Sequence, residues 1–117
     1  FILFANKNLI DELLPVLDSF NLAFGNKESW EKVDSNWRTG VEYIYSQLET
    51  VLKTHGLVMM GDENEPFSPE KHAAVEKVPT KNKEEDGLIK EVLQRGFMLK
   101  DKVIRPAKVK VFAYEEN

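Results

Sequence analysis

The sequence predicts an α+β fold, in which N-terminal helices form a dimeric four-helix bundle and a small β-rich head domain follows. Apolar residues recur every three or four positions as far as residue 55, which is typical of amphipathic helices. After Gly56 this periodicity gives way to short apolar runs and alternation, separated by loops that contain Gly, Pro and charged residues. We therefore divide the chain into a helical dimerisation region, residues 1–56, and a head, residues 57–117.

The first predicted helix covers residues 1–24 and carries two adjacent apolar stripes. Pro15 lies inside it, and because an interior proline costs about 3 kcal/mol and bends a helix, we expect one kinked helix. Gly25-Asn26 is a typical helix end. Together the stripes are wider than one partner helix would cover. The first stripe consists of Leu9, Leu13, Val16, Phe20 and Ala23, and the second of Ile10, Leu14, Leu17 and Phe24.

The second predicted helix follows a segment, residues 26–36, that is polar and loop-like except for Trp30, and it is capped by Asp34 or Ser35. It ends at Gly56. Gly40 lies near its start, where glycine costs about 1 kcal/mol relative to alanine, so we expect another backbone to approach closely there. The apolar positions form a strict heptad seam. This seam consists of Trp37, Val41, Ile44, Leu48, Val51 and His55.

Two amphipathic helices, one with so wide an apolar face, cannot bury themselves alone. The most economical arrangement is two copies of the chain packed as a four-helix bundle about a two-fold axis. The alternative is that the helices cover the β-rich region instead. The residues expected at the dimer interface are Leu13, Phe20, Trp37, Val41, Ile44 and Leu48.

The head begins with an apolar run, residues 57–60, which predicts a buried strand. A loop covers residues 61–72, and the next strand, residues 73–78, is expected to stop at Pro79. A charged loop over residues 80–87 ends in an Asp-Gly turn.

Residues 88–95 have mixed periodicity, but their place between a turn and a hairpin favours a strand. Residues 96–111 predict a basic β-hairpin, with a polar turn at Lys100 to Lys102 and an interruption at Arg105-Pro106, because proline donates no N–H. Residues 90–110 hold seven Lys or Arg against two acids in a chain of net charge −4, which suits a partner-binding role. The last strand alternates apolar Ala107, Val109 and Val111 with Lys108 and Lys110.

The sequence offers little catalytic chemistry. It has no cysteine, so neither a disulfide nor a thiol nucleophile can form. We interpret His55 as a partly buried packing residue and His72 as a hydrogen-bonding residue rather than a metal ligand beside Glu70. No glycine-rich phosphate loop is present. We therefore expect no enzymatic activity, no catalytic residue, no cofactor and no metal.

The N-terminal residues, Phe1 to Ala5, are apolar but far fewer than the roughly 20 that span a bilayer, and they lack the basic region of a signal peptide. The chain starts without Met or a helix cap, so we expect residue 1 to continue a helix that begins upstream.

Four spaced motifs point to a family. Two lie in the head, residues 67–75 (FSPEKHAAV) and 96–107 (GFMLKDKVIRPA), and two in the helices, residues 12–20 (ELLPVLDSF) and Gly40-Val41-Glu42. Together they resemble the GrpE family, the nucleotide exchange factors of bacterial and organellar Hsp70 (DnaK), over essentially the whole chain. Ser68 departs from the family's usual Asp or Asn, but all three residues close the same kind of turn.

The resemblance implies a homodimer, with one head on each protomer, in the bacterial cytoplasm or an organellar matrix. The head would bind the Hsp70 ATPase domain and favour its open cleft, which accelerates ADP release. The partner contacts implied are Leu93 and Val111, as apolar groups, and Lys102, as a charge where the family often has Arg. Gly40 matches a family glycine that supports the interface through helix packing. Neither nucleic acid nor a membrane is expected as a partner.

Two other functions stay open. Basic residues interleaved with aromatic ones over residues 97–114 would suit a nucleic-acid-binding module, although the acidic remainder of the chain disfavours it. The other alternative is an inert structural dimerisation module. Salt-dependent binding of oligonucleotides would select the first, and dimerisation without Hsp70 affinity would select the second.

Overall fold

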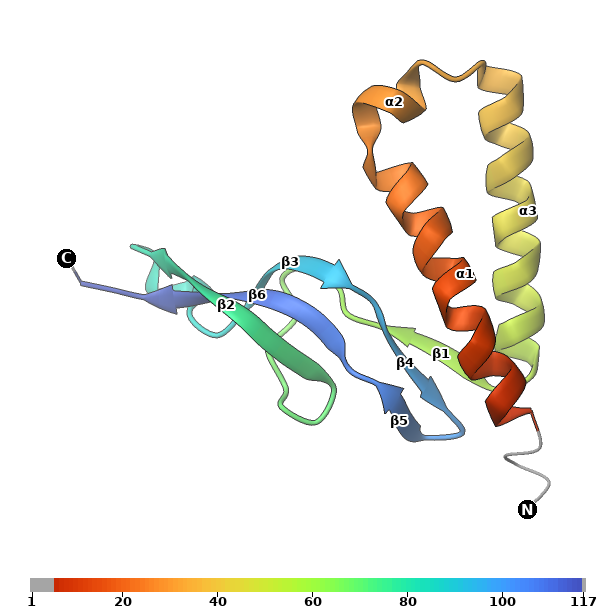
Figure 1. Ribbon diagram of the computed structural model, residues 1–117. Helices are drawn as coiled ribbons and strands as arrows, with labels where there is room; N and C mark the ends of the chain where they lie inside the picture. The colour runs from red at the N-terminus through yellow and green to blue at the C-terminus, as the bar shows by residue number, and fades with distance from the viewer. Residues whose placement is uncertain (1–5, 117) are drawn as a thin grey trace. The chain divides into compact units, whose positions relative to one another are not determined.

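A computed structural model describes residues 6–116 (Figure 1). In this part of the chain, three α-helices precede six strands, so the predicted α+β class and the order of its elements are confirmed. The chain separates into two compact units, one up to Leu57 and one from Val58, and each is described by itself.

Helix α1 (Lys7–Gly25) runs through Pro15, as expected for one helix rather than two. Its first five predicted residues lie outside the described chain. A short helix, α2 (Lys27–Glu31), follows where the sequence predicted a loop. That prediction was wrong because a five-residue helix shows no periodicity, and it is capped locally. The Asn26 side chain accepts a hydrogen bond from Ser29 N at 3.3 Å.

Helix α3 (Ser35–Thr54) begins after Asp34, one of the two predicted caps, whose carboxylate accepts a hydrogen bond from Asn36 N at 3.0 Å. The chain turns after it at Gly56, whose φ of +96° favours glycine. His55 is exposed within this chain, so the described residues do not supply the packing expected for it. His55 is the C-terminal cap of α3, where the chain already leaves the helical path that would carry it along the seam.

An aromatic cluster joins the three helices. The ring of Phe24 lies 5.1 Å from Trp30 and 5.3 Å from Tyr45, measured between centroids, and Phe20 lies 5.3 Å from Tyr45. Tilted and edge-on pairs at these separations are favourable beyond the apolar area that they bury. Trp30, the large apolar residue of the predicted loop, therefore attaches α2 to the neighbouring helices.

The apolar stripes differ in burial. In α1 the second stripe is the covered one, whereas Leu9 of the first stripe remains 59% exposed and Val16 42%. In α3 part of the heptad seam remains open, with Trp37 71% and Ile44 57% exposed, whereas Val41 and Leu48 are half-buried. The buried residues of the two helices are Ile10, Leu14, Leu17, Tyr45 and Leu52.

The second unit is built on two three-stranded sheets. The first sheet has the order β1-β4-β5, formed by Leu57–Met60, Gly96–Leu99 and Lys102–Arg105. The second has the order β2-β6-β3, formed by His72–Thr80, Ala107–Tyr114 and Ile89–Gln94. The strands predicted over 57–60 and 88–95 are confirmed. The predicted stop at Pro79 was wrong, because β2 is an edge strand and one of its sides needs no N–H donor.

Residues 96–111 do not form one hairpin. Strands β4 and β5 do pair as a hairpin, around a two-residue turn in which Lys100 (φ +50°) and Asp101 (φ +69°) are both left-handed. Strand β6 instead crosses to the second sheet, where it lies parallel to β2 and antiparallel to β3. The local alternation predicted this strand but not its partners, because parallel pairing joins segments far apart in the sequence.

The alternation predicted for β6 is confirmed, since Lys108 is exposed between buried neighbours. These neighbours form the core of the second sheet together with one residue of β3, and Phe67 and Val92 pack against them. The core residues are Ile89, Ala107, Val109 and Val111.

Candidate functional site

The three implied partner contacts lie on three strands of the head and differ in exposure. Leu93, on β3, is 48% exposed, and Lys102, the first residue of β5, is also exposed. Val111, on β6, is only 8% exposed and pairs with Ile89 in the core. Leu93 and Val111 therefore share the second sheet, whereas Lys102 belongs to the first. Two of the three present their side chains to solvent.

One basic residue of the second sheet is paired across its strands. Lys110 Nζ lies 3.5 Å from a carboxylate oxygen of Glu76 on β2 and 3.5 Å from one of Glu91 on β3. The negative charge of Glu76, and then that of Glu91, raises the pKa of the Lys110 ammonium group above its ordinary value. Lys110 therefore connects β2, β6 and β3, and it is less available to a partner than the basic composition suggested.

The loop before β2 is held by His72, which is 3% exposed. Its Nδ1 accepts a hydrogen bond from Ser68 N at 2.9 Å, which confirms the predicted hydrogen-bonding role. The acid beside its ring is Glu65, 3.5 Å from Nε2, rather than Glu70. Over residues 6–116, no three His, Asp or Glu side chains gather as a metal ion would require.

The aromatic surface needed by a nucleic-acid module is partly missing. Phe97 is fully buried, and the guanidinium carbon of Arg105 lies 4.9 Å from the centroid of its ring. No base could stack on a ring covered in this way, which disfavours the nucleic-acid alternative.

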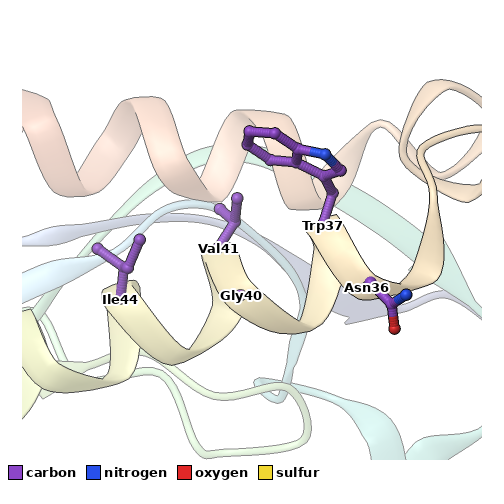
Figure 2. Close-up of a pocket in the computed structure, with 5 residues that line it drawn as sticks. All are labelled: Asn36, Trp37, Gly40, Val41 and Ile44. Carbon is purple, nitrogen blue, oxygen red and sulfur yellow. The ribbon is translucent and has the colours of Figure 1, made fainter.

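A second candidate surface lies on α3. The side chains of Trp37, Val41 and Ile44 leave the helix on one side, as Figure 2 shows. With Asn36 and Gly40 they line an open pocket of about 250 Å³. A Cβ atom placed at Gly40 would meet no heavy atom within 4 Å. The close backbone approach expected at Gly40 is therefore not made by the described part of this chain.

The other residues expected at the dimer interface are less open. Leu13 and Leu48 are half-buried. Phe20 packs against Phe24 and Tyr45 within the chain, with ring centroids 6.1 and 5.3 Å away. The sequence spacing could not distinguish these residues from Trp37 and Ile44, because all of them lie on regular stripes. In the described chain, none of the helices has the length and apolar content needed to cross a membrane.

Comparison with known proteins gives a consistent match. A family model described as GrpE matches residues 2–113. Protein GrpE from Brevibacillus choshinensis is 39% identical over 109 residues, which cover 92% of this chain and 59% of the relative. Protein GrpE from Stenotrophomonas maltophilia (strain R551-3) is 39% identical over 110 residues, covering 94% and 62%. Protein GrpE from Parageobacillus thermoglucosidasius is 40% identical over 105 residues, covering 90% and 46%. The chain thus spans about half to three-fifths of these relatives' lengths.

Proposed function

The chain belongs to the GrpE family, and from this premise we propose that it is a nucleotide exchange factor for an Hsp70 chaperone. The observation that carries the proposal is the family match over residues 2–113, which includes both the helices and the head. The proposed partner is the ATPase domain of Hsp70 with ADP bound.

The proposed mechanism is a shift between two conformations of the partner. The head binds the open ATPase domain more tightly than the closed, nucleotide-filled one, so its binding favours the open cleft. ADP then loses contacts from one wall of the cleft and dissociates, and ATP can bind next. By linkage, the nucleotide weakens binding of the head by the same factor. In this mechanism no residue of the chain needs to touch ADP.

We assign the partner contact first to Leu93 and Lys102, because both side chains are exposed. Burying the open half of Leu93 would contribute about 1 kcal/mol. Lys102 would pair with an acidic patch, although a lysine lacks the bidentate geometry of arginine. Val111 is the third proposed contact, and at 8% exposure it has little surface to offer.

We further propose that two copies associate through α1 and α3 as a four-helix bundle. The support is the apolar surface left open on both helices, including Leu9, Val16, Trp37 and Ile44. Glycine at position 40 would allow the backbone of the second copy to approach α3 closely, which would explain why a glycine lies near the start of this helix.

Release of a fluorescent ADP analogue from a cognate Hsp70 tests the exchange activity. We expect micromolar chain to accelerate release, and Leu93→Ser and Lys102→Ala to weaken the acceleration. Val75→Ser and Lys81→Ala are matched controls, since Val75 is a 53% exposed apolar residue on β2 and Lys81 an exposed lysine after that strand. The wild-type chain failing to accelerate release would refute the proposal. Dimerisation without any Hsp70 affinity would select the inert module instead.

A further inference from the structure

The chain passes between the two sheets of the head three times, and two of these crossings lie next to each other. It leaves β3 for β4 at Arg95-Gly96 and returns from β5 to β6 at Arg105-Pro106 (Figure 1). We call these four residues the junction.

The two crossings touch backbone to backbone. A Cβ atom at Gly96 would lie 2.5 Å from Ala107 N and 2.8 Å from Arg105 O, distances at which the backbone would have to move. Only glycine, which has no Cβ, permits this approach. The separation of the crossings is therefore set by the absence of a side chain at position 96.

The side chain of Arg105 links the two crossings by hydrogen bonds. Its guanidinium group donates two hydrogen bonds to Arg95 O, from Nη2 at 2.7 Å and from Nε at 3.2 Å. The same planar group lies over the buried ring of Phe97. A flat group with several fixed donors can make both contacts at once, whereas the compact ammonium of lysine cannot.

The loop before β2 is attached at the same place. Ala107 N donates a hydrogen bond to Lys71 O at 2.9 Å, and Arg95 Nη2 lies 3.7 Å from Asp62 Oδ1. A change in the junction would therefore alter the positions of both sheets and of this loop.

We propose that Arg105 is a positioning residue, which holds β3 and β5 so that Leu93 and Lys102 meet the partner at the same time. Both residues lie within a few positions of the junction, one in each sheet. Two contacts with the same partner strengthen each other only when forming the first holds the second residue in position to bind. The inference rests on the proposed function, because it takes the two contacts from there.

A double-mutant cycle measured by calorimetry with the Hsp70 ATPase domain tests the inference. Arg105→Lys keeps the charge but loses the paired hydrogen bonds, and we expect it to weaken binding about tenfold. Lys102→Ala should weaken wild-type binding about fivefold but the Arg105→Lys protein less than about twofold. Val109→Ala opens the core of the second sheet without removing a hydrogen bond of the junction, so it controls for lost stability and should leave the effect of Lys102→Ala at full size. An equal effect of Lys102→Ala in the wild-type and Arg105→Lys backgrounds would overturn the inference.

Residual dipolar couplings of the free protein give a readout that does not depend on the partner. We expect the amides of both sheets to fit a single alignment in the wild type and to require two in Arg105→Lys. One alignment in both proteins would overturn the inference, even if the chaperone binds normally. A wild-type chain that has one alignment but does not bind Hsp70 would instead overturn the proposed function, and with it the role of Arg105 in binding.

Discussion

Replacing Trp37 by alanine tests whether the open seam of α3 is a dimer interface. A tryptophan has up to about 250 Å² of surface to bury, and Trp37 is 71% exposed. At about 25 cal/mol per Å², complete burial of the open part would contribute about 4 kcal/mol. We take about half of this as the loss on truncation, because alanine keeps some contact and the partner covers the side chain incompletely.

Because a two-fold interface contains the residue twice, the loss is about 4 kcal/mol per dimer. The dissociation constant of the dimer should then rise about a thousandfold.

Analytical ultracentrifugation over a range of chain concentrations measures this change. Tyr43→Ala is the matched control, because Tyr43 is 64% exposed on the same helix but lies about 120° around it from Trp37. Its removal should leave association unchanged. Far-UV circular dichroism of both variants should show the helix content of the parent. The reasoning is refuted if Trp37→Ala associates as tightly as the parent, or if Tyr43→Ala weakens association equally.

Three further predictions concern stability and association. The side chain introduced by Gly40→Ala would meet no heavy atom within 4 Å in the described chain, and alanine favours a helix by about 1 kcal/mol relative to glycine. We therefore expect the helical unit to be about 1 kcal/mol more stable in urea unfolding at low chain concentration, and dimerisation measured by ultracentrifugation to be weaker. Tighter dimerisation would contradict close approach at Gly40. The raised pKa of Lys110 contributes stability that is present below pH 10.5 and is lost as the pH rises through the higher folded value. Lys110→Arg, which stays charged, should therefore lose less stability than the parent in urea titrations above that pH, and an equal loss would contradict the ion pairing. His72→Phe leaves Ser68 N–H without its acceptor and should cost about 1–3 kcal/mol, seen as a lower melting temperature and faster exchange of the Ser68 amide; slow exchange in the variant would contradict the assignment.

The two long helices could be predicted from the spacing of apolar residues alone, but the surface that covers each apolar stripe could not. In α1, the stripe of Leu14 and the stripe of Leu9 have equivalent spacing, yet one is buried and the other is open. Periodicity reports that a face is apolar, and it carries no information on whether the same chain or another copy covers it. The short helix α2 was missed because its signals, a cap at Asn26 and one tryptophan, are local and not periodic.

In the β-rich half, the local pattern likewise predicts which residues are buried but not which strands pair. Alternation in residues 107–111 predicted a half-buried strand and the correct buried set. It could not predict that β6 pairs in parallel with β2 rather than extending the hairpin, because the register depends on contacts between distant segments. The resemblance supplied the candidate contact residues, but not their burial.

The burial of Val111 changes how its substitution should be interpreted. Val111 is 8% exposed and pairs with Ile89, so a smaller side chain at position 111 would leave a cavity and destabilise the sheet that carries Leu93. Weaker Hsp70 binding by a Val111 variant would follow from that loss even if the residue never touched the partner. Leu93 is 48% exposed, and its replacement by serine removes apolar surface without opening the core. Weaker Hsp70 binding after substitution of Leu93 therefore indicates a direct contact. Substitution of Val111 is informative only when the loss of affinity is larger than the loss of stability accounts for.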